Sequence, residues 1–324
     1  MYPLKLIQNR IIAAFGSEQF LNEPIKLYEP ITYTLGQSGK RLRPVLVLLS
    51  CDLFGGDIEK AVLPAMGLEI FHNFTLLHDD IMDDAPLRRG KETVHKKWND
   101  NTAILSGDTM FVLAYEYVAK TDPGLLPDVL RLFNDTARKV CEGQQYDMNF
   151  ETQTNVTIHD YMMMIQLKTA VLIACSLKLG AIIAQADPVE AEKIYAFGIE
   201  LGLAFQLQDD YLDAFGDTAV FGKEVGGDII TNKKTFLYLK AFEVASHDDL
   251  SRLDHFFNNP KIEASEKVSA VIHLYQNLKI DQHTRQEIES HFQKATVILD
   301  GLSVAEENKE EIRSLALGMV GRNR

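Results

Sequence analysis

The sequence contains the same acidic pattern twice: two adjacent aspartates and a third one three residues after them. The members are Asp79, Asp80 and Asp83 in the first copy, and Asp209, Asp210 and Asp213 in the second. Each copy follows helix-compatible residues, and residues i and i+4 of a helix lie on one face, about one turn apart. Carboxylates on one face repel one another unless a cation or strong base offsets their charge. Since Mg²⁺ prefers a few carboxylate oxygens plus substrate phosphates, the pattern predicts magnesium sites.

An acidic chain also produces aspartate pairs by chance. The sequence carries 46 Asp and Glu against 33 Lys and Arg, a net charge of -13. The pair Asp248-Asp249 has no third aspartate and lies in a polar stretch, so we interpret it as a helix start. Apolar residues precede the two longer patterns, including Phe74 and Leu77 before the first and Phe205 before the second. Carboxylates beside core residues need compensation, which favours a functional site over a solvated acidic face.

The composition indicates a folded globular protein, because 46% of the 324 residues are hydrophobic. The acidic balance argues against a nucleic acid partner, which needs a basic surface. The three cysteines lack the spacing typical of zinc sites or disulfide frameworks, so we expect a reducing, cytoplasmic location. No uncharged apolar run reaches membrane-spanning length; the nearest, 169–186, contains Lys178 and predicts a buried helix without a transmembrane segment.

Long helices are expected to dominate, because Gly and Pro, 20 and 10 in total, fall mostly where periodic segments end. We predict one all-α domain over residues 1–324. The expected helices are 3–15, 18–36, 40–53, 57–84, 100–120, 124–150, 157–186, 188–216, 232–246, 265–280, 283–300 and 305–319. Residues 195–207 remain ambiguous here, because they alternate at period two like a strand, yet their small residues also suit a tightly packed helix.

Basic residues accompany the acidic patterns. Arg88 and Arg89 directly follow the first pattern, and a compact group containing Lys40 and Arg43 precedes it. Further lysines follow at Lys168, Lys223, Lys233 and Lys234. Taken singly, each would be a solvated surface charge. Together they suggest two anion sites, one bridged to carboxylates by Mg²⁺ and one held by cations alone.

The order of these groups resembles that of the trans-isoprenyl diphosphate synthases, the polyprenyl synthetase family, and specifically its short-chain geranylgeranyl and farnesyl types. The resemblance covers residues 39–235. Its motifs are Gly39-Lys40-x-x-Arg43-Pro44, His72, the first acidic pattern with Arg88-Arg89-Gly90, Gly143-Gln144 with Asp147, Lys168-Thr169, Phe205-Gln206 with the second acidic pattern, and Gly222-Lys223 with Asp228 and Lys233. Residues 1–38 and 236–324 show helical periodicity only.

This resemblance implies an isoprenoid synthase-type bundle of about ten or more helices around a deep central cavity, with the acidic patterns facing each other across its mouth. It also favours a helix over residues 195–207. The implied enzyme is a prenyltransferase that condenses isopentenyl diphosphate head-to-tail (1'-4) with an allylic diphosphate and releases diphosphate. Three Mg²⁺ ions would be bound with the allylic diphosphate.

The resemblance also implies a role for each site residue. Asp79, Asp83 and Asp209 would bind Mg²⁺ directly, with Asp80, Asp210 and Asp213 acting through water or as supporting groups. Arg88, Lys168, Lys223 and Lys233 would neutralise the allylic diphosphate, and Lys40, Arg43, His72 and Arg89 would hold isopentenyl diphosphate without metal. Thr169 and Gln206 would line the carbocation with negative dipoles. The released diphosphate would accept the proton, because no protein base stands out.

Helix geometry bears on product length. If 57–84 is one helix, Phe74 lies about 7–8 Å and Phe71 about 12 Å along its axis from Asp79, where both can form a cavity floor. Bulky residues there limit elongation in the family, but Thr75 is smaller than the second aromatic of many farnesyl enzymes. The first pattern also lacks the insertion usual in bacterial farnesyl enzymes. We expect geranylgeranyl diphosphate as the main product and farnesyl diphosphate as the next; the alternative is that both phenylalanines are ordinary core residues.

Other classes of protein remain as alternatives. His78-Asp79, with His72 and His95, resembles the metal site of helical phosphohydrolases, but that class leaves the second acidic pattern and the lysines unexplained. A class I terpene cyclase shares the helical cavity and first pattern, but its second metal motif usually differs. A non-catalytic subunit usually loses site residues, all of which are present here.

Two further expectations concern assembly and the C-terminus. The family commonly forms homodimers, and the expected helix 100–120 is long and apolar enough for an interface. Arg322 and Arg324 could close over a bound diphosphate, with a solvated tail as the alternative.

Overall fold

Helices form nearly every element of the computed structural model, which describes residues 2–37, 39–216 and 225–321. Contacts between Cα atoms divide the chain into two compact units. The first unit comprises Met1–Asn134, Ser176–Glu192 and Ser303–Ile312, and the second comprises Asp135–Cys175, Lys193–Leu302 and Arg313–Arg324. The all-α class predicted from the sequence is confirmed.

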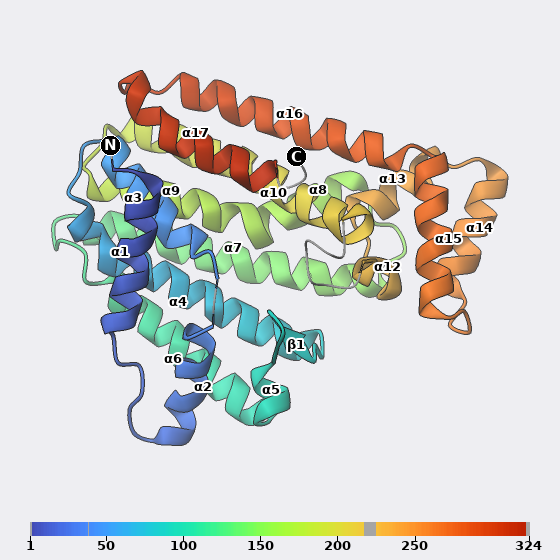
Figure 1. Cartoon of the computed structure of the whole chain (residues 1–324), viewed down its shortest axis with the longest axis horizontal. Helices are drawn as coiled ribbons and strands as arrows, with labels where there is room; N and C mark the ends of the chain where they lie inside the picture. The colour runs from blue at the N-terminus through green and yellow to red at the C-terminus, as the bar shows by residue number, and fades with distance from the viewer. Residues whose placement is uncertain (1, 38, 217–224, 322–324) are drawn as a thin grey trace. The chain divides into compact units, whose positions relative to one another are not determined.

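The first unit contains the N-terminal elements (Figure 1). They are α1 (Leu4–Ser17), α2 (Ile25–Leu35), α3 (Leu42–Leu53), α4 (Ile58–Met82), strands β1 (Leu87–Arg88) and β2 (Lys91–Glu92), α5 (Val94–Lys97) and α6 (Asp100–Val118). Helix α4 packs against both α3 and α6. Gly67 permits close approach to α6, since a Cβ there would lie 2.7 Å from the Val118 side chain.

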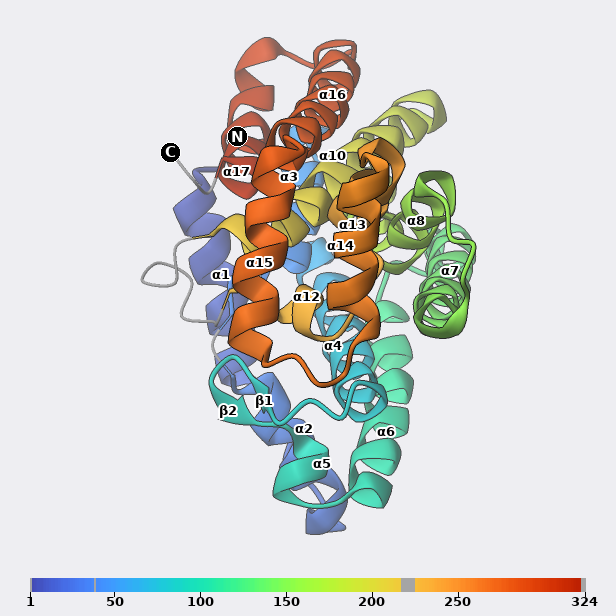
Figure 2. The ribbon, with the colours of Figure 1, turned by 90° about the vertical axis from the view of Figure 1, so that its right-hand side faces the viewer.

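The second unit contains most of the C-terminal elements, several of which face the viewer in Figure 2. They are α8 (Ile158–Ile165), the π-helical turn η1 (Gln166–Ala170), α12 (Gly227–Ile230), α13 (Phe236–Val244), α14 (His247–Asn258), α15 (Ala264–Asn277) and α16 (Ile280–Asp300). Helix α15 packs against α12, α14 and α16, and α13 packs against α8 and α16. Four helices begin in one unit and end in the other: α7 (Leu126–Thr152), α9 (Val171–Ile183), α10 (Pro188–Phe215) and α17 (Glu306–Val320).

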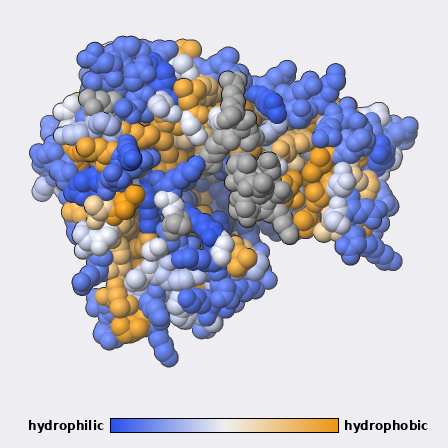
Figure 3. Space-filling view, in the orientation of Figure 1, coloured by the Kyte–Doolittle hydropathy of each residue, from blue (hydrophilic) through white to orange (hydrophobic). Residues whose placement is uncertain are grey.

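Buried aromatic and aliphatic side chains form the core of each unit. In the second unit, one cluster includes Tyr161, Leu207, Tyr211 and Phe236, all at most 4% exposed. On the face of the molecule shown in Figure 3, hydrophilic side chains cover most of the described surface and the apolar areas are smaller. This distribution agrees with the globular character inferred from the composition.

Two uncertain segments are helical. Residues 195–207 lie inside α10, so tight packing of small residues prevailed over the strand-like alternation: a Cβ on Gly202 would lie 2.5 Å from the Ala170 Cα. The stretch Ile158–Ile183 is long and apolar enough to span a membrane, but 67% of its most apolar window is buried within the protein. It overlaps the segment 169–186 that we predicted to be a buried helix.

Other boundaries were wrong or missed. The helix expected over 18–36 begins only at Ile25, directly after Pro24. The sequence did not reveal the β1–β2 hairpin, α5 or α12, because each spans at most four residues and too few periodic positions mark them. Helix α14 also escaped the segment prediction, although Asp248-Asp249 was correctly interpreted as its start: the Ser246 side chain caps it by accepting from the Asp249 N–H.

Candidate active site

The first acidic pattern lies at the C-terminal end of α4. Asp79 and Asp80 occupy its last turn, and Asp83 is the C-cap residue, whose N–H donates to the Asp79 carbonyl at 2.9 Å. Asp80 is buried, whereas Asp83 is exposed. A helix C-terminus already carries partial negative charge and therefore disfavours carboxylates. Three of them in one turn need a compensating cation.

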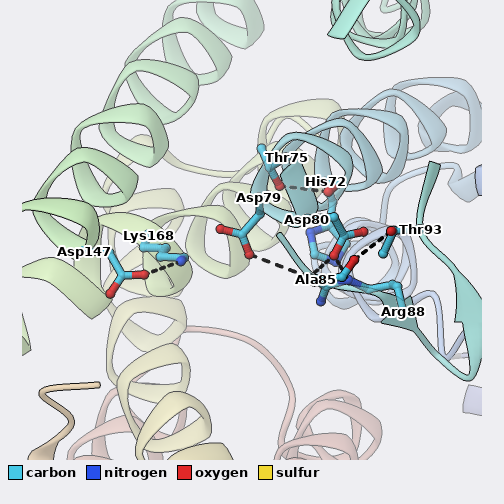
Figure 4. A network of polar contacts seen from close by, with 9 residues as sticks. All are labelled: His72, Thr75, Asp79, Asp80, Ala85, Arg88, Thr93, Asp147 and Lys168. Atoms are coloured by element: carbon cyan, nitrogen blue, oxygen red, sulfur yellow. Dashed lines mark hydrogen bonds and ion pairs between the residues drawn. The ribbon is translucent and has the colours of Figure 1, made fainter. Parts of the chain in front are cut away.

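Arg88 from β1 supplies a positive charge at this position (Figure 4). Its Nε donates to Asp80 Oδ1 at 2.7 Å, while its Nη2 lies 2.6 Å from the same oxygen and 3.7 Å from Asp79 Oδ2. Burial raises the pKa of Asp80, and the guanidinium opposes that rise. Burial also opposes the charge on Arg88, but the hydrogen bond and charge of Asp80 outweigh it and raise the Arg88 pKa. The ion pair thus ties the hairpin to α4.

The hairpin turn directs the guanidinium of the next residue, Arg89, away from the aspartates. Arg89 and Gly90 have φ angles of 54° and 75°, as a two-residue hairpin turn requires. Arg89 consequently reaches Gly39, where an added Cβ would lie 2.8 Å from Arg89 Nη1. A side chain at position 39 would therefore force this guanidinium to shift from its place beside the first basic group.

His72, in α4, lies within the field of several guanidinium groups. Its pKa is well below the ordinary histidine value, first because of burial and then because of the charges of Arg43, Arg89, Arg88 and Arg41. A neutral imidazole can still donate one hydrogen bond. This part of the first unit therefore suits a compact polyanion such as a diphosphate, and it brings together three of the four residues predicted to hold one without metal.

The remaining members of the first basic group differ in role. Lys40, the fourth predicted residue, is exposed. Arg41 turns inward: its Nη1 lies 3.1 Å from Glu69 Oε1, its Nη2 donates to the Leu35 carbonyl, and its guanidinium lies 4.4 Å from the Phe15 ring centroid. Because Glu69 is buried, Arg41 serves as a structural counter-ion that the sequence pattern did not distinguish from its neighbours.

The predicted floor residues lie one to two turns before the first acidic pattern. Phe71 is fully buried against Phe74, Phe111 and Phe133. Phe74 is only partly buried and stacks on Phe111 with a centroid distance of 5.1 Å. Thr75 donates its hydroxyl to the carbonyl of His72 at 2.8 Å. Phe74 is therefore better placed than Phe71 to contact a ligand, and Phe111 supports it from α6.

The second acidic pattern lies near the end of α10 and uses neutral partners. Buried Asp210 accepts the Tyr161 hydroxyl at Oδ2 and the Gln206 amide at Oδ1, the latter at 2.9 Å. Burial and the charge of Asp228 raise the pKa of Asp210 well above its ordinary value, against the effect of both hydrogen bonds. Asp209, on the same turn, is partly buried.

Asp213 organises the segment that follows. Its Oδ2 accepts from the Asp228 N–H at 2.9 Å, and its carbonyl accepts from the Gly226 N–H at 2.7 Å. These bonds hold the first turn of α12 against α10. A small open pocket of the second unit is lined by Asp210, Asp213, Asp228 and Lys233, so two of the predicted metal residues and one predicted diphosphate residue share a surface.

The π-helical turn η1 presents Lys168 and Thr169. Lys168 Nζ lies 2.6 Å from Asp147 Oδ2 on α7, and Thr169 donates to Gln206 Oε1 at 2.9 Å (Figure 4 shows the lysine pair). Helix α7 approaches this turn closely, because a Cβ on Gly143 would lie 2.3 Å from the Lys168 backbone nitrogen. Insertions of one residue into a helix in this way often mark functional sites.

Lys233 and Lys234 are adjacent in sequence but have different surroundings. Lys234 Nζ donates to the carbonyls of Phe150, Gln153 and Glu151, the last two at 2.7 and 3.4 Å. These carbonyls lie at or just after the C-terminal end of α7, where a cation is favourable. Lys234 therefore fastens the loop before α13, whereas Lys233 lines the pocket described above.

Some expectations fall outside the described residues: those for Lys223, with its neighbour Gly222, and for Arg322 and Arg324. Among the residues that the structure does describe, no group of three or more carboxylate, histidine or cysteine side chains is close enough to enclose a metal ion.

The comparisons with known proteins agree with these features. The polyprenyl synthetase family model matches residues 24–275. A short chain isoprenyl diphosphate synthase of Methanothermobacter thermautotrophicus is 43% identical over 231 residues, 71% of each chain. A geranylgeranyl diphosphate synthase of Saccharolobus solfataricus is 39% identical over 278 residues, 83% of this chain and 84% of the relative. A crystal structure of a geranylgeranyl pyrophosphate synthase superposes with a TM-score of 0.95 at 46% identity, covering 100% of both chains.

These matches confirm the isoprenoid synthase fold that was expected from the motifs. They identify the family and do not test the roles of single residues. The chain belongs to the polyprenyl synthetase family and is a prenyltransferase of the trans-isoprenyl diphosphate synthase type.

Proposed function

We propose that the protein condenses isopentenyl diphosphate with allylic diphosphates, head-to-tail and with Mg²⁺, to give geranylgeranyl diphosphate as the main product and farnesyl diphosphate as the next. The observation that carries this proposal lies in the first unit. There, α4 and its hairpin present a carboxylate group around Asp79 next to a cationic group around His72. One enzyme thus offers two kinds of diphosphate site, as a condensation of two diphosphates requires.

The family is metal-dependent, and the donor set here fits magnesium. In each acidic pattern the middle aspartate is committed to protein partners, Arg88 for Asp80 and the Tyr161–Gln206 pair for Asp210. The flanking aspartates are more accessible, namely Asp79, Asp83, Asp209 and Asp213. Mg²⁺ takes one or two carboxylates and fills its shell with water and phosphate oxygens, so this arrangement suits three ions held with the allylic diphosphate.

Bound Mg²⁺ supplies Lewis-acid stabilisation of the charge that develops on the departing diphosphate. Arg88, Lys168, Lys223 and Lys233 add positive charge around the same diphosphate, while Lys40, Arg43, His72 and Arg89 hold isopentenyl diphosphate. The oxygens of Thr169 and Gln206 stabilise the allylic cation without a nucleophile strong enough to trap it. The isopentenyl double bond then attacks the allylic cation and forms the new C–C bond. The released diphosphate accepts the proton that the resulting cation loses.

The product length rests on Phe74. Its ring is partly buried and stacks on Phe111, and fully buried Phe71 contacts both rings. In our proposal this ring forms the floor for the growing chain. Thr75 beside it keeps the floor open enough for a geranylgeranyl chain. The names of the relatives from Saccharolobus solfataricus and other organisms agree with this product.

We expect F74A to shift the products toward chains longer than geranylgeranyl diphosphate, because the truncated ring opens the cavity floor. Chromatography of the dephosphorylated products measures the shift. F111A tests the backing ring in the same assay and should give a smaller shift, and unchanged product lengths in F74A would refute the floor assignment.

Three broader expectations accompany this function. The single family match over 24–275 crosses both compact units, which supports one polyprenyl synthetase domain. Ile104, Leu105 and Val112 are 45–58% exposed on α6, which supports a homodimer through this helix. A reducing cytoplasm fits the three cysteines, Cys51, Cys141 and Cys175, whose number and spacing in the sequence do not suit a disulfide framework.

The decisive experiment incubates the protein with Mg²⁺, isopentenyl diphosphate and, in turn, dimethylallyl, geranyl or farnesyl diphosphate, and then measures product lengths. Chain elongation to geranylgeranyl diphosphate is the expected result. A hydrocarbon formed from farnesyl diphosphate alone would indicate a cyclase, and no turnover of any pair would indicate a non-catalytic subunit.

A further inference from the structure

Four side chains of the second unit form one continuous hydrogen-bonded chain. The Tyr161 hydroxyl bonds to Asp210 Oδ2, Asp210 Oδ1 accepts from Gln206 Nε2 at 2.9 Å, and Gln206 Oε1 accepts from Thr169 Oγ at 2.9 Å. Tyr161 is 2% exposed and Asp210 7%. Tyr161 lies two helical turns before Lys168 and belongs to none of the motifs that led us to the active site.

The chain has a fixed direction. Asp210 Oδ1 can only accept from Gln206, whether the proton shared at Oδ2 belongs to the tyrosine or to the carboxyl group. The amide of Gln206 therefore turns its nitrogen toward Asp210 and its oxygen toward Thr169. The Thr169 hydroxyl must in turn donate its hydrogen to that oxygen. Its own oxygen lone pairs then point away from the chain.

The backbone around Thr169 is held as firmly as the side chain. The π-helical turn that carries it is flanked by two glycines, and a Cβ on either would collide with it: Gly143 at 2.3 Å from the Lys168 nitrogen and Gly202 at 2.5 Å from the Ala170 Cα. Helices α7 and α10 thus contact this turn through their backbones. Because the backbone of the turn is fixed, the rotation of the Thr169 hydroxyl remains, and the hydrogen-bonded chain sets its orientation.

We propose that Tyr161 is a positioning residue for catalysis, which acts through Asp210 and Gln206 to orient the Thr169 oxygen toward the cation formed at the allylic carbon. This inference rests on the proposed function and deepens it, because it assigns Asp210 to the orienting chain instead of to the metal. Preorganised dipoles aimed at developing charge stabilise a transition state without stabilising the bound substrate equally. Loss of Tyr161 should therefore lower kcat and leave KM nearly unchanged.

A double-mutant cycle with Y161F and T169V tests this route. We expect Y161F alone to lower kcat about fivefold to tenfold, with KM for both diphosphates within about twofold. In the T169V background, Y161F should have no further effect, because the group that it orients is gone. Equal effects of Y161F in both backgrounds would overturn the proposal and leave Tyr161 a purely structural residue.

Y117F is the matched control. Tyr117 is also buried and donates its hydroxyl to a carboxylate, Glu18, at 2.6 Å, but it lies outside both acidic patterns. It should lose stability as Y161F does while keeping the wild-type kcat. If Y161F does not fold, D210L cuts the chain at its next link, because leucine can neither accept from Gln206 nor bond to Tyr161. The same cycle with T169V then applies: an additive loss would show that Asp210 acts independently of Thr169, for example on a metal.

The two levels of the proposal fail differently. Absence of elongation by the wild-type protein would refute the proposed function. Normal elongation by the wild type with an additive cycle would refute only the positioning role of Tyr161.

Discussion

Asp80 and Asp210 occupy the same place in the two acidic patterns, yet their partners are of opposite kinds. Asp80 ends a helix and is held by the charge of Arg88. Asp210 is buried within a helix and is held by the neutral donors Tyr161 and Gln206. Equal spacing in the sequence therefore does not mean equal chemistry. The first pattern is neutralised by an arginine, and the second lies in a network of neutral hydrogen-bond donors.

What the patterns share is their accessible aspartates. D79N and D209N should each lower kcat by about 10³-fold or more, because each removes a charge on which Mg²⁺ and the allylic diphosphate depend. Steady-state assays over a range of Mg²⁺ concentrations measure the loss. D84N is the control, since Asp84 is exposed next to the first pattern and pairs with Lys96; a comparable loss in that variant would contradict the assignment.

The charged partner of the first pattern should matter for stability. R88L leaves buried Asp80 without its cation and should lower the free energy of unfolding by about 3 kcal/mol, as broken buried ion pairs do. Urea denaturation measures this. The double variant R88L/D80L should regain most of that stability without regaining activity, and a stable R88L would show that the pair contributes nothing to the fold.

The hairpin separates two guanidinium groups that should give different kinetic results. R89M should raise KM for isopentenyl diphosphate about 30-fold, or about 2 kcal/mol, with little change for the allylic substrate. R88M is the matched comparison and should chiefly affect the allylic side. If R89M changed KM for both substrates equally, the two anion sites would not be distinct.

The two regions should give stability pH dependences of opposite sign, and that of the first region comes from His72. Folding lowers the pKa of His72. Below about pH 6.5 the unfolded chain therefore binds a proton that the folded chain does not, and the free energy of unfolding decreases as the pH is lowered. At pH 5.5 this costs about 1.4 kcal/mol relative to pH 7.5. The H72Q substitution should remove this contribution of His72, which denaturation of both proteins at the two pH values measures. An identical pH dependence in H72Q would show that other groups cause it.

Much of this arrangement could be predicted from residue order. Spacing on a helix placed Asp79 and Asp83 one turn apart, and the succession of basic motifs indicated an anion site containing Arg43, His72 and Arg89. The structure agrees with this relative placement, because the geometry is local or is carried by the family pattern, whereas anion binding at these residues stays a prediction. The bundle of helices was predictable for the same reason.

The tasks of neighbouring basic residues were not predictable. Whether a cation meets a substrate or a protein group depends on chain segments far away in sequence: Lys234 binds the carbonyl of Phe150, and Arg41 binds Glu69. Tyr161 was missed because a tyrosine at helical spacing looks like any core residue until its partner is known. Burial and partner identity arise from packing, which no single-sequence pattern encodes.

The hairpin turn at Arg89 and Gly90 has a consequence for how this sequence can vary. Two adjacent side chains reach two different targets because Arg88 ends strand β1 whereas Arg89 lies in the turn itself. Gain or loss of a single residue in this turn would exchange or misdirect both guanidinium groups at once, although every residue type of the motif would survive. Length at this point is therefore as constrained as chemistry, and a relative that preserves both arginines but alters their spacing need not preserve either of their tasks.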